Sequence, residues 1–157
     1  MEQHSPTPGP PADAIAMLQA EHQQVRDLFR HYETTPEPDT RRQIAHHVCT
    51  ALARHAQLEE TLFYPAFHAV TDDEGKLLVA EAVAAHQAIQ ELMEDLRDPD
   101  LEEEVFAARF LGLKATVEAH LAAEEHALFP FAAEDLADNM APLLGEMQAL
   151  HQRLTAS

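Results

Sequence analysis

The 157-residue sequence has one cysteine, no tryptophan and only four glycines, and it contains no long hydrophobic run. A single cysteine excludes an internal disulfide framework. A transmembrane helix needs about 20 apolar residues in a row, so we expect no membrane span. The N-terminal segment "MEQHSPTPGPPAD" lacks the basic start and apolar centre of a signal peptide. The default expectation is therefore a cytoplasmic location.

Basic residues are also scarce, because ten Lys and Arg stand against 28 Asp and Glu, for a formal net charge of −18. Such a surface repels phosphate backbones and anionic lipids, which argues against nucleic-acid and membrane partners. Apolar residues, in contrast, make up 46% of the chain, enough for one domain with a hydrophobic core. Eleven histidines are many for this length, and histidine is the commonest metal ligand.

The composition predicts helices, because Ala, Leu, Glu, Gln and Arg dominate long stretches and no β-branched alternation indicates strands. Short connections predict antiparallel neighbours, and hence an all-α, up-down-up-down four-helix bundle with a short fifth C-terminal helix. We expect residues 1–11 to form a flexible N-terminal arm and residues 12–157 to form one domain. The expected helices lie roughly at 12–33, 40–69, 72–97, 99–134 and 137–155.

Two of the helix starts carry specific signals. The pattern Thr71-x-x-Glu74 is typical of a capping box. The sequence "DPD" (98–100) predicts an N-cap at Asp98, with the following proline at the first helical position.

One segment is spelled nearly twice, as "HAQLEETLFYP" (55–65) and "HLAAEEHALFP" (120–130). Each copy begins with His, carries Glu four places on, repeats that Glu, and ends in an apolar run and Pro. The prolines, Pro65 and Pro130, each remove a backbone donor and should kink or end a helix. A second echo links "AEHQQVRDLF" (20–29) with "AAHQAIQELM" (84–93). The chain thus reads as two similar helical hairpins, each with the order H…HxxxE.

Each apolar helix stripe is interrupted by polar residues near its middle. A single histidine on an apolar face is usually a hydrogen-bonded core residue, but here every helix carries one. His and Glu at i and i+4 share a helix face, so packing the hairpins together would gather all of these side chains around one pocket. The pocket suits two metal ions, each with two terminal His, both Glu bridging, and an open position. The six candidate ligands are His22, His55, Glu59, His86, His120 and Glu124.

The types of candidate ligand atom narrow the choice of metal. Imidazole with carboxylate suits iron best, with manganese and zinc as competitors. No thiolate is offered, which disfavours a structural zinc site. The Glu-x-x-His pattern of ferritin-type carboxylate bundles is absent. The alternative without metal is a polar bundle core held by His–Glu hydrogen bonds.

The order H…HxxxE…H…HxxxE resembles the hemerythrin family, specifically its bacterial HHE cation-binding branch, over roughly residues 12–134. The resemblance implies four iron-ligating His and two bridging Glu, in an oxo- or hydroxo-bridged di-iron centre. Oxygen-carrying hemerythrins have a further His one turn after the third-helix His, where this chain has Gln90. Their last ligand pair is His-x4-Asp, whereas this chain has His-x3-Glu. These departures predict a more symmetric and more open site, suited to oxygen, peroxide or nitric oxide.

For the residues near the six candidate ligands we expect surface positions, hydrogen bonds to the ligands or packing, rather than metal binding. We expect Glu60 and Glu125 at the surface or as hydrogen-bond partners of the ligands. Arg26 and Gln90, each one turn beyond a candidate ligand, are further candidate partners. Cys49 is interpreted as packing filler. The remaining histidines are expected to face outward or, for His4, to lie in the arm.

Three functions remain open from the sequence. The first is a binding protein that holds iron and takes up O2 or a related small oxidant (nitric oxide, peroxide) at an open iron position. The second is a di-iron enzyme that removes peroxide or nitric oxide, for which the sequence identifies no catalytic residue beyond the ligands. The third is a metal-free helical interaction protein.

Overall fold

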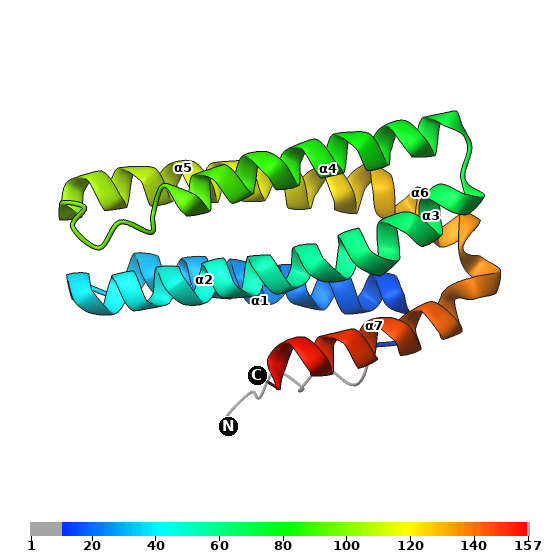
Figure 1. Ribbon diagram of the computed structural model, residues 1–157, viewed down its shortest axis with the longest axis horizontal. Coiled ribbons are helices and arrows are strands. Elements are labelled where there is room, and N and C mark those ends of the chain that lie inside the picture. The colour runs from blue at the N-terminus through cyan, green and yellow to red at the C-terminus, as the bar shows by residue number, and fades with distance from the viewer. Residues whose placement is uncertain (1–10, 157) are drawn as a thin grey trace, which may run out of the picture.

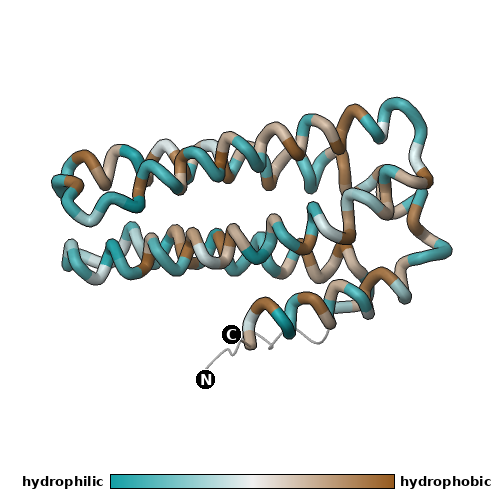
Figure 2. The backbone as a smooth tube through the Cα atoms, viewed as in Figure 1, coloured by the Kyte–Doolittle hydropathy of each residue, from teal (hydrophilic) through white to brown (hydrophobic). Residues whose placement is uncertain are grey.

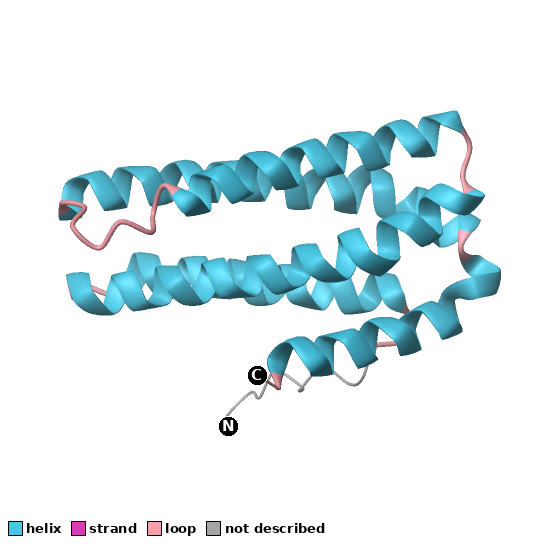
Figure 3. Cartoon of the chain, viewed as in Figure 1, coloured by secondary structure: helices cyan, strands magenta, loops and turns pink. Residues whose placement is uncertain are grey.

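Two antiparallel helical hairpins form the body of the molecule, as the sequence predicts. The computed structural model describes residues 11–156, which contain no strand (Figures 1 and 3). The first hairpin joins α1 (Ala14–Thr34) to α2 (Pro38–Leu58), and the second joins α4 (Asp73–Glu94) to α5 (Glu103–Ala123). The all-α four-helix bundle is therefore confirmed. The predicted N-terminal arm lies, apart from its last residue, outside the described residues.

The second and fourth helices of the bundle each continue through a π-helical turn. In the second, η1 (Glu59–Phe63) leads into α3 (Tyr64–Val70). In the fourth, η2 (Glu124–Leu128) leads into α6 (Phe129–Asp135). Each π turn is closed by a backbone N–H that reaches the carbonyl of the Glu five residues earlier, Glu59 or Glu124.

The two prolines do not end these helices, contrary to one of the two outcomes that the sequence predicts. Pro65 and Pro130 lie in the first turn of α3 and α6, directly after the π turns. A proline in a first helical turn is tolerated because the N–H it lacks has no partner within that helix. The helices accordingly run on without a break over residues 59–70 and 124–135, and the ribbon of α2 continues into α3 (Figure 1).

Both predicted helix-start signals are wrong in detail. Asp72, not Thr71, caps α4 by accepting a hydrogen bond from the Gly75 N–H at 3.0 Å, because the Thr71 N–H is already bonded to the last turn of α3. Asp98 does not cap α5, which begins five residues later at Glu103. Its carboxylate accepts from the Asp100 N–H at 2.9 Å and stabilises a turn instead.

The fifth helix covers one side of the bundle. After the short 3-10 turn η3 (Ala137–Asn139), α7 (Met140–Thr155) packs on α1, α2 and η1 (Figure 1). It buries Leu143, Met147 and Leu150. This placement confirms the expectation that the C-terminal helix packs against the bundle.

The hydrophobic core is divided into two clusters along the bundle axis. One cluster, which includes Leu18, Phe63 and Met147, lies at the α7 end. The other, which includes Val25 and Phe110, lies at the opposite end. In Figure 2 apolar positions recur along every helix between polar ones. None of the described helices is long and apolar enough to cross a membrane.

Candidate metal centre

Polar side chains fill the layer between the two core clusters. They come from the middle of α1 and α4, from the last turns of α2 and α5, and from the first residue of each π turn. All are buried, with exposed fractions between 0 and 7%. They are the six residues that the sequence predicts: His22, His55, Glu59, His86, His120 and Glu124.

The four imidazoles form two pairs, each drawn from one hairpin. His22 and His55 face each other with Nε2 atoms 3.2 Å apart. His86 and His120 do the same at 3.0 Å. Two facing Nε2 atoms can share one proton or donate their lone pairs to one cation. The geometry therefore contains two pairs of facing imidazoles, one from each hairpin.

Glu59 lies between the two imidazole pairs. Its Oε1 atom is 3.1 Å from Nε2 of His55 and 3.0 Å from Nε2 of His86. Its other oxygen, Oε2, is buried and has no hydrogen-bond partner among the described residues. One carboxylate therefore reaches both pairs, which is the position that a bridging ligand requires.

Glu124 mirrors this arrangement from the other hairpin. Its Oε1 atom is 3.2 Å from Nε2 of His22 and 3.3 Å from Nε2 of His120, but makes no hydrogen bond with described residues. A buried carboxylate oxygen without a partner is costly. A cation between the imidazole pairs would satisfy both carboxylates, so the residues present fit a metal centre better than a closed hydrogen-bond network.

The ligand atoms fall into two overlapping groups in which all atoms lie within 4.8 Å of one another. Glu59 belongs to both groups. One group is His22, His55, Glu59 and Glu124; the other is Glu59, His86 and His120. Nitrogen and carboxylate oxygen together suit iron, manganese or zinc.

Without a cation, protons balance the buried charges. Burial alone would lower the pKa of His55, but the charge of Glu59 and the hydrogen bonds that the imidazole donates to nearby carboxylates raise it well above its usual value. Burial alone would lower the pKa of His120, but the neighbouring carboxylates of Glu124 and Glu59 together raise it to about 9. Burial alone would raise the pKa of Glu59, but the charge of His55 and hydrogen bonds from its neighbours together lower it well below its usual value. The cage thus attracts positive charge, as protons or as metal.

Carboxylates outside the cage hold the His22–His55 pair. Nδ1 of His22 donates to Glu125 at 2.9 Å, and Nδ1 of His55 donates to Glu21 at 2.7 Å. Glu125 also receives two hydrogen bonds from Arg26, both 2.8 Å. The structure therefore places Glu125 and Arg26 among the partners of the ligands, which is one of the roles that the sequence left open for them.

The sequence reasoning missed Glu21, which precedes His22 but reaches His55 on the neighbouring helix. A pattern within one helix does not reveal such a contact. Gln90, proposed as a partner by its spacing from His86, makes no side-chain hydrogen bond within residues 11–156. Glu60 is half-exposed and lies 3.6 Å from Nδ1 of His86.

Tyr64 is a second residue that the sequence reasoning missed. Its buried hydroxyl donates to Oε2 of Glu124 at 2.7 Å and lies 3.2 Å from Nε2 of His86. Burial first, and then the charges of Glu59 and Glu124, raise its pKa far above the usual range, so the hydroxyl keeps its proton and acts as a donor. The available signal was its position in "LFYP", where the second copy has Phe129.

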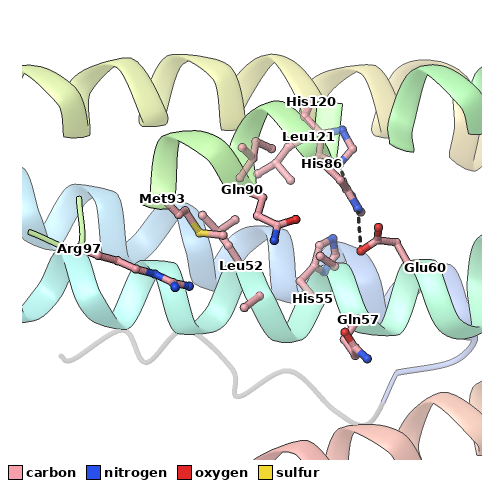
Figure 4. Close-up of a pocket in the computed structure, with 13 residues that line it drawn as sticks. Leu52, His55, Gln57, Glu60, His86, Gln90, Met93, Arg97, His120 and Leu121 are labelled. Atoms are coloured by element: carbon pink, nitrogen blue, oxygen red, sulfur yellow. Dashed lines mark hydrogen bonds and ion pairs between the residues drawn. The ribbon is translucent and has the colours of Figure 1, made fainter. Parts of the chain in front are cut away.

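A cavity of about 200 Å³ leads to the site between α2 and α4 (Figure 4). Its inner end is formed by His55, His86 and His120. The walls combine apolar side chains with the polar groups of Gln57, Glu60, Gln90 and Arg97, as Figure 4 shows. His22 does not line the cavity: it is fully buried and stacks on Phe129, with ring centroids 5.4 Å apart.

Fold and site together define a class: a four-helix bundle whose buried His and Glu side chains form a candidate cation site. Comparison with known families adds that residues 13–132 match the hemerythrin HHE cation binding domain. The match covers most of the chain, so the protein belongs to this family, and the resemblance seen in the sequence is confirmed. Neither the curated proteins nor the solved structures searched contain a match to the chain.

Proposed function

We propose that this chain holds two iron ions in the buried cage and takes up O2 or a related small oxidant, such as nitric oxide or peroxide, at an open iron position. The observation that carries the proposal is the placement of Glu59 and Glu124, each of which spans the two imidazole pairs. Two positions joined by two carboxylates call for two cations rather than one. Membership of a cation-binding family supports the same reading.

Each candidate ligand would hold one or both of the ions. His22 and His55 would hold one ion, His86 and His120 the other, and the two Glu would hold both. Iron would supply reversible electron transfer and an open coordination position. The apolar walls around the cage limit water there and so strengthen each local charge.

The cavity between α2 and α4 gives the route by which a small molecule would arrive. It reaches His86 and His120 through a wall of apolar side chains that includes Leu52, Ile89 and Met93. Such walls admit uncharged small oxidants. The acidic surface, with its net charge of −18, repels nucleic acid and anionic lipid, and we propose neither as a partner.

The test begins with the metal content of the full chain after anaerobic iron loading. We expect about two irons per chain, and a visible absorption spectrum that changes on exposure to air. His55→Ala and Glu59→Ala should each lose most of the metal, because each removes a ligand. His126→Ala, which changes an exposed His next to the site, is the matched control and should keep two irons.

The outcomes separate the three functions. A stable, reversible spectral change with O2, nitric oxide or peroxide supports the binding protein. Repeated consumption of peroxide or nitric oxide would assign the enzymatic alternative instead. Absence of metal after loading, or two irons retained in both ligand variants, would leave only the metal-free interaction protein or a different site.

A further inference from the structure

The two halves of the cage differ in how their imidazoles are held from outside. In the first half, both Nδ1 atoms donate to carboxylates, His22 to Glu125 at 2.9 Å and His55 to Glu21 at 2.7 Å. In the second half, Nδ1 of His86 is buried without a hydrogen bond to any described residue. Nδ1 of His120 has no carboxylate partner within residues 11–156.

One pair of equivalent carboxylates shows the difference directly. Glu125 and Glu60 hold the same place in the two repeated segments, and each faces the His on the neighbouring hairpin. Arg26 clamps Glu125 with two hydrogen bonds of 2.8 Å. Glu60 has no such clamp among residues 11–156; its side chain is 46% exposed, and its Oε2 atom lies 3.6 Å from Nδ1 of His86.

The sequence explains the difference at two positions. In the repeated segments around His22 and His86, Glu21 and Arg26 of the first copy are replaced by Ala85 and Gln90 in the second. These two replacements remove the carboxylate partner and the clamp from the second half. The candidate ligands themselves do not differ, because each hairpin supplies two His and one Glu.

A carboxylate that accepts the Nδ1–H of a metal-binding imidazole fixes the tautomer, leaves the Nε2 lone pair free and raises its basicity. It also places negative charge near the cation. Both effects strengthen cation binding. They act on the His22–His55 pair, through Glu125 and Glu21, and are missing from the His86–His120 pair.

We propose that the two cation positions are unequal: the His22–His55 position retains its ion, and the His86–His120 position binds its ion more weakly and exchanges it. Glu21, Glu125 and Arg26 act as positioning residues for the retained ion. The inference rests on the proposed two-cation function. It agrees with access, since the cavity reaches both His of the weaker position but only one, His55, of the other.

The experiment is a titration of the metal-free full chain with Co²⁺ in competition with a chromophoric chelator. We expect two binding steps. The double variant Glu21→Ala/Arg26→Gln gives the first half the residues of the second, and should weaken the tighter step by roughly 10- to 100-fold. Glu60→Gln removes the same kind of charge from the other half and should leave the tighter step unchanged.

The reciprocal variant, Ala85→Glu/Gln90→Arg, should strengthen the weaker step and bring the two together. Both changes lie at exposed or half-buried positions, so the fold should persist, which circular dichroism checks. Two single variants assign the steps to the halves. His86→Ala should keep the tighter step, and His22→Ala should lose it, even if only one step is measurable.

Two equal steps in the unchanged protein would overturn the inference and leave the proposed function standing. The same holds if His22→Ala keeps the tighter step while His86→Ala loses it, or if Glu60→Gln weakens that step as much as the double variant does. A chain that binds no Co²⁺ at all would overturn both.

Discussion

Tyr64 and Phe129 hold equivalent places in the two repeated segments, but only Tyr64 brings a polar atom to the site. Its hydroxyl donates to Glu124 and lies beside His86, whereas Phe129 stacks on His22. A single oxygen atom thus distinguishes two otherwise similar apolar positions. It gives Oε2 of Glu124 its hydrogen bond, while Oε2 of Glu59, the other carboxylate, has none among the described residues.

Tyr64→Phe should therefore weaken the site without unfolding the bundle. Removing the donor leaves a buried Glu124 oxygen unsatisfied, at a cost of about 1–3 kcal/mol to the metal-free protein. Metal affinity should fall by roughly tenfold, as is usual when a partner of a ligand is lost. Urea unfolding and chelator competition measure the two effects. Tyr32→Phe, at the chain's other tyrosine, lies in the opposite core cluster and should leave metal affinity unchanged.

Cys49 should be protected from thiol reagents while the protein is folded. Burial raises the pKa of its thiol from 9.0 to about 11, with Arg97 opposing only in part. At pH 8 the folded protein then holds roughly a hundredfold less thiolate than the unfolded chain, and the thiolate is the reactive form. Alkylation by iodoacetamide should be slower by about that factor, and should keep accelerating up to pH 11. Equal rates with and without urea would contradict the assignment.

The residue scale also shows where sequence reasoning works and where it stops. His22, His55 and Glu59 could be predicted because helical spacing puts each on the apolar face of its own helix, where a polar side chain needs an explanation. Glu21 and Tyr64 could not, because each contacts a ligand from another helix. Such contacts depend on how the helices pack.

At the scale of the elements, helices were easier to predict than their ends. Thr71 and Asp98 were both expected to start a helix, and neither does. Several residues near each boundary could cap a helix. Which of them does so depends on the residue at which the preceding helix ends. The π turns at Glu59 and Glu124 were not predicted either. A π turn differs from an α turn by one residue and is not visible in the pattern of apolar positions.

Replacing Gly75 in the first turn of α4 should destabilise the protein, whereas replacing Gly112 in α5 should not. A Cβ atom at residue 75 would lie 1.8 Å from Oγ1 of Thr71 and 2.7 Å from its Cβ, so no rotation of Thr71 relieves the contact. Gly75→Ala should destabilise the protein by about 1–3 kcal/mol. Gly112→Ala meets nothing within 4 Å and should stabilise it by about 0.5–1 kcal/mol. Urea unfolding measures both, and a Gly75→Ala protein as stable as the original would contradict the close contact.

At the scale of the whole molecule, the polar layer separates two apolar clusters that would each be an ordinary bundle core. The sequence predicts this layer, because every stripe is interrupted at the same height. It does not predict the cavity between α2 and α4, which depends on how far those helices stand apart. Both hairpins contribute side chains to the layer, so the interactions within it determine how strongly the two hairpins are held together.

Metal should therefore stabilise the whole fold rather than one helix. The ligands come from α1, α4 and the two helices that contain π turns, and no such cage exists in the unfolded chain. A cation at 100 times its Kd that binds only the folded protein adds about 2.7 kcal/mol, which is roughly 5–10 °C in the melting temperature of a domain of this size. Thermal melts should show this rise on iron or Co²⁺ addition and its loss with chelator. His55→Ala, which removes a ligand of one position, should show a smaller rise, while His126→Ala should show the full shift. A rise of equal size in His55→Ala would mean that the stabilising metal binds elsewhere, among the 28 acidic side chains of the chain.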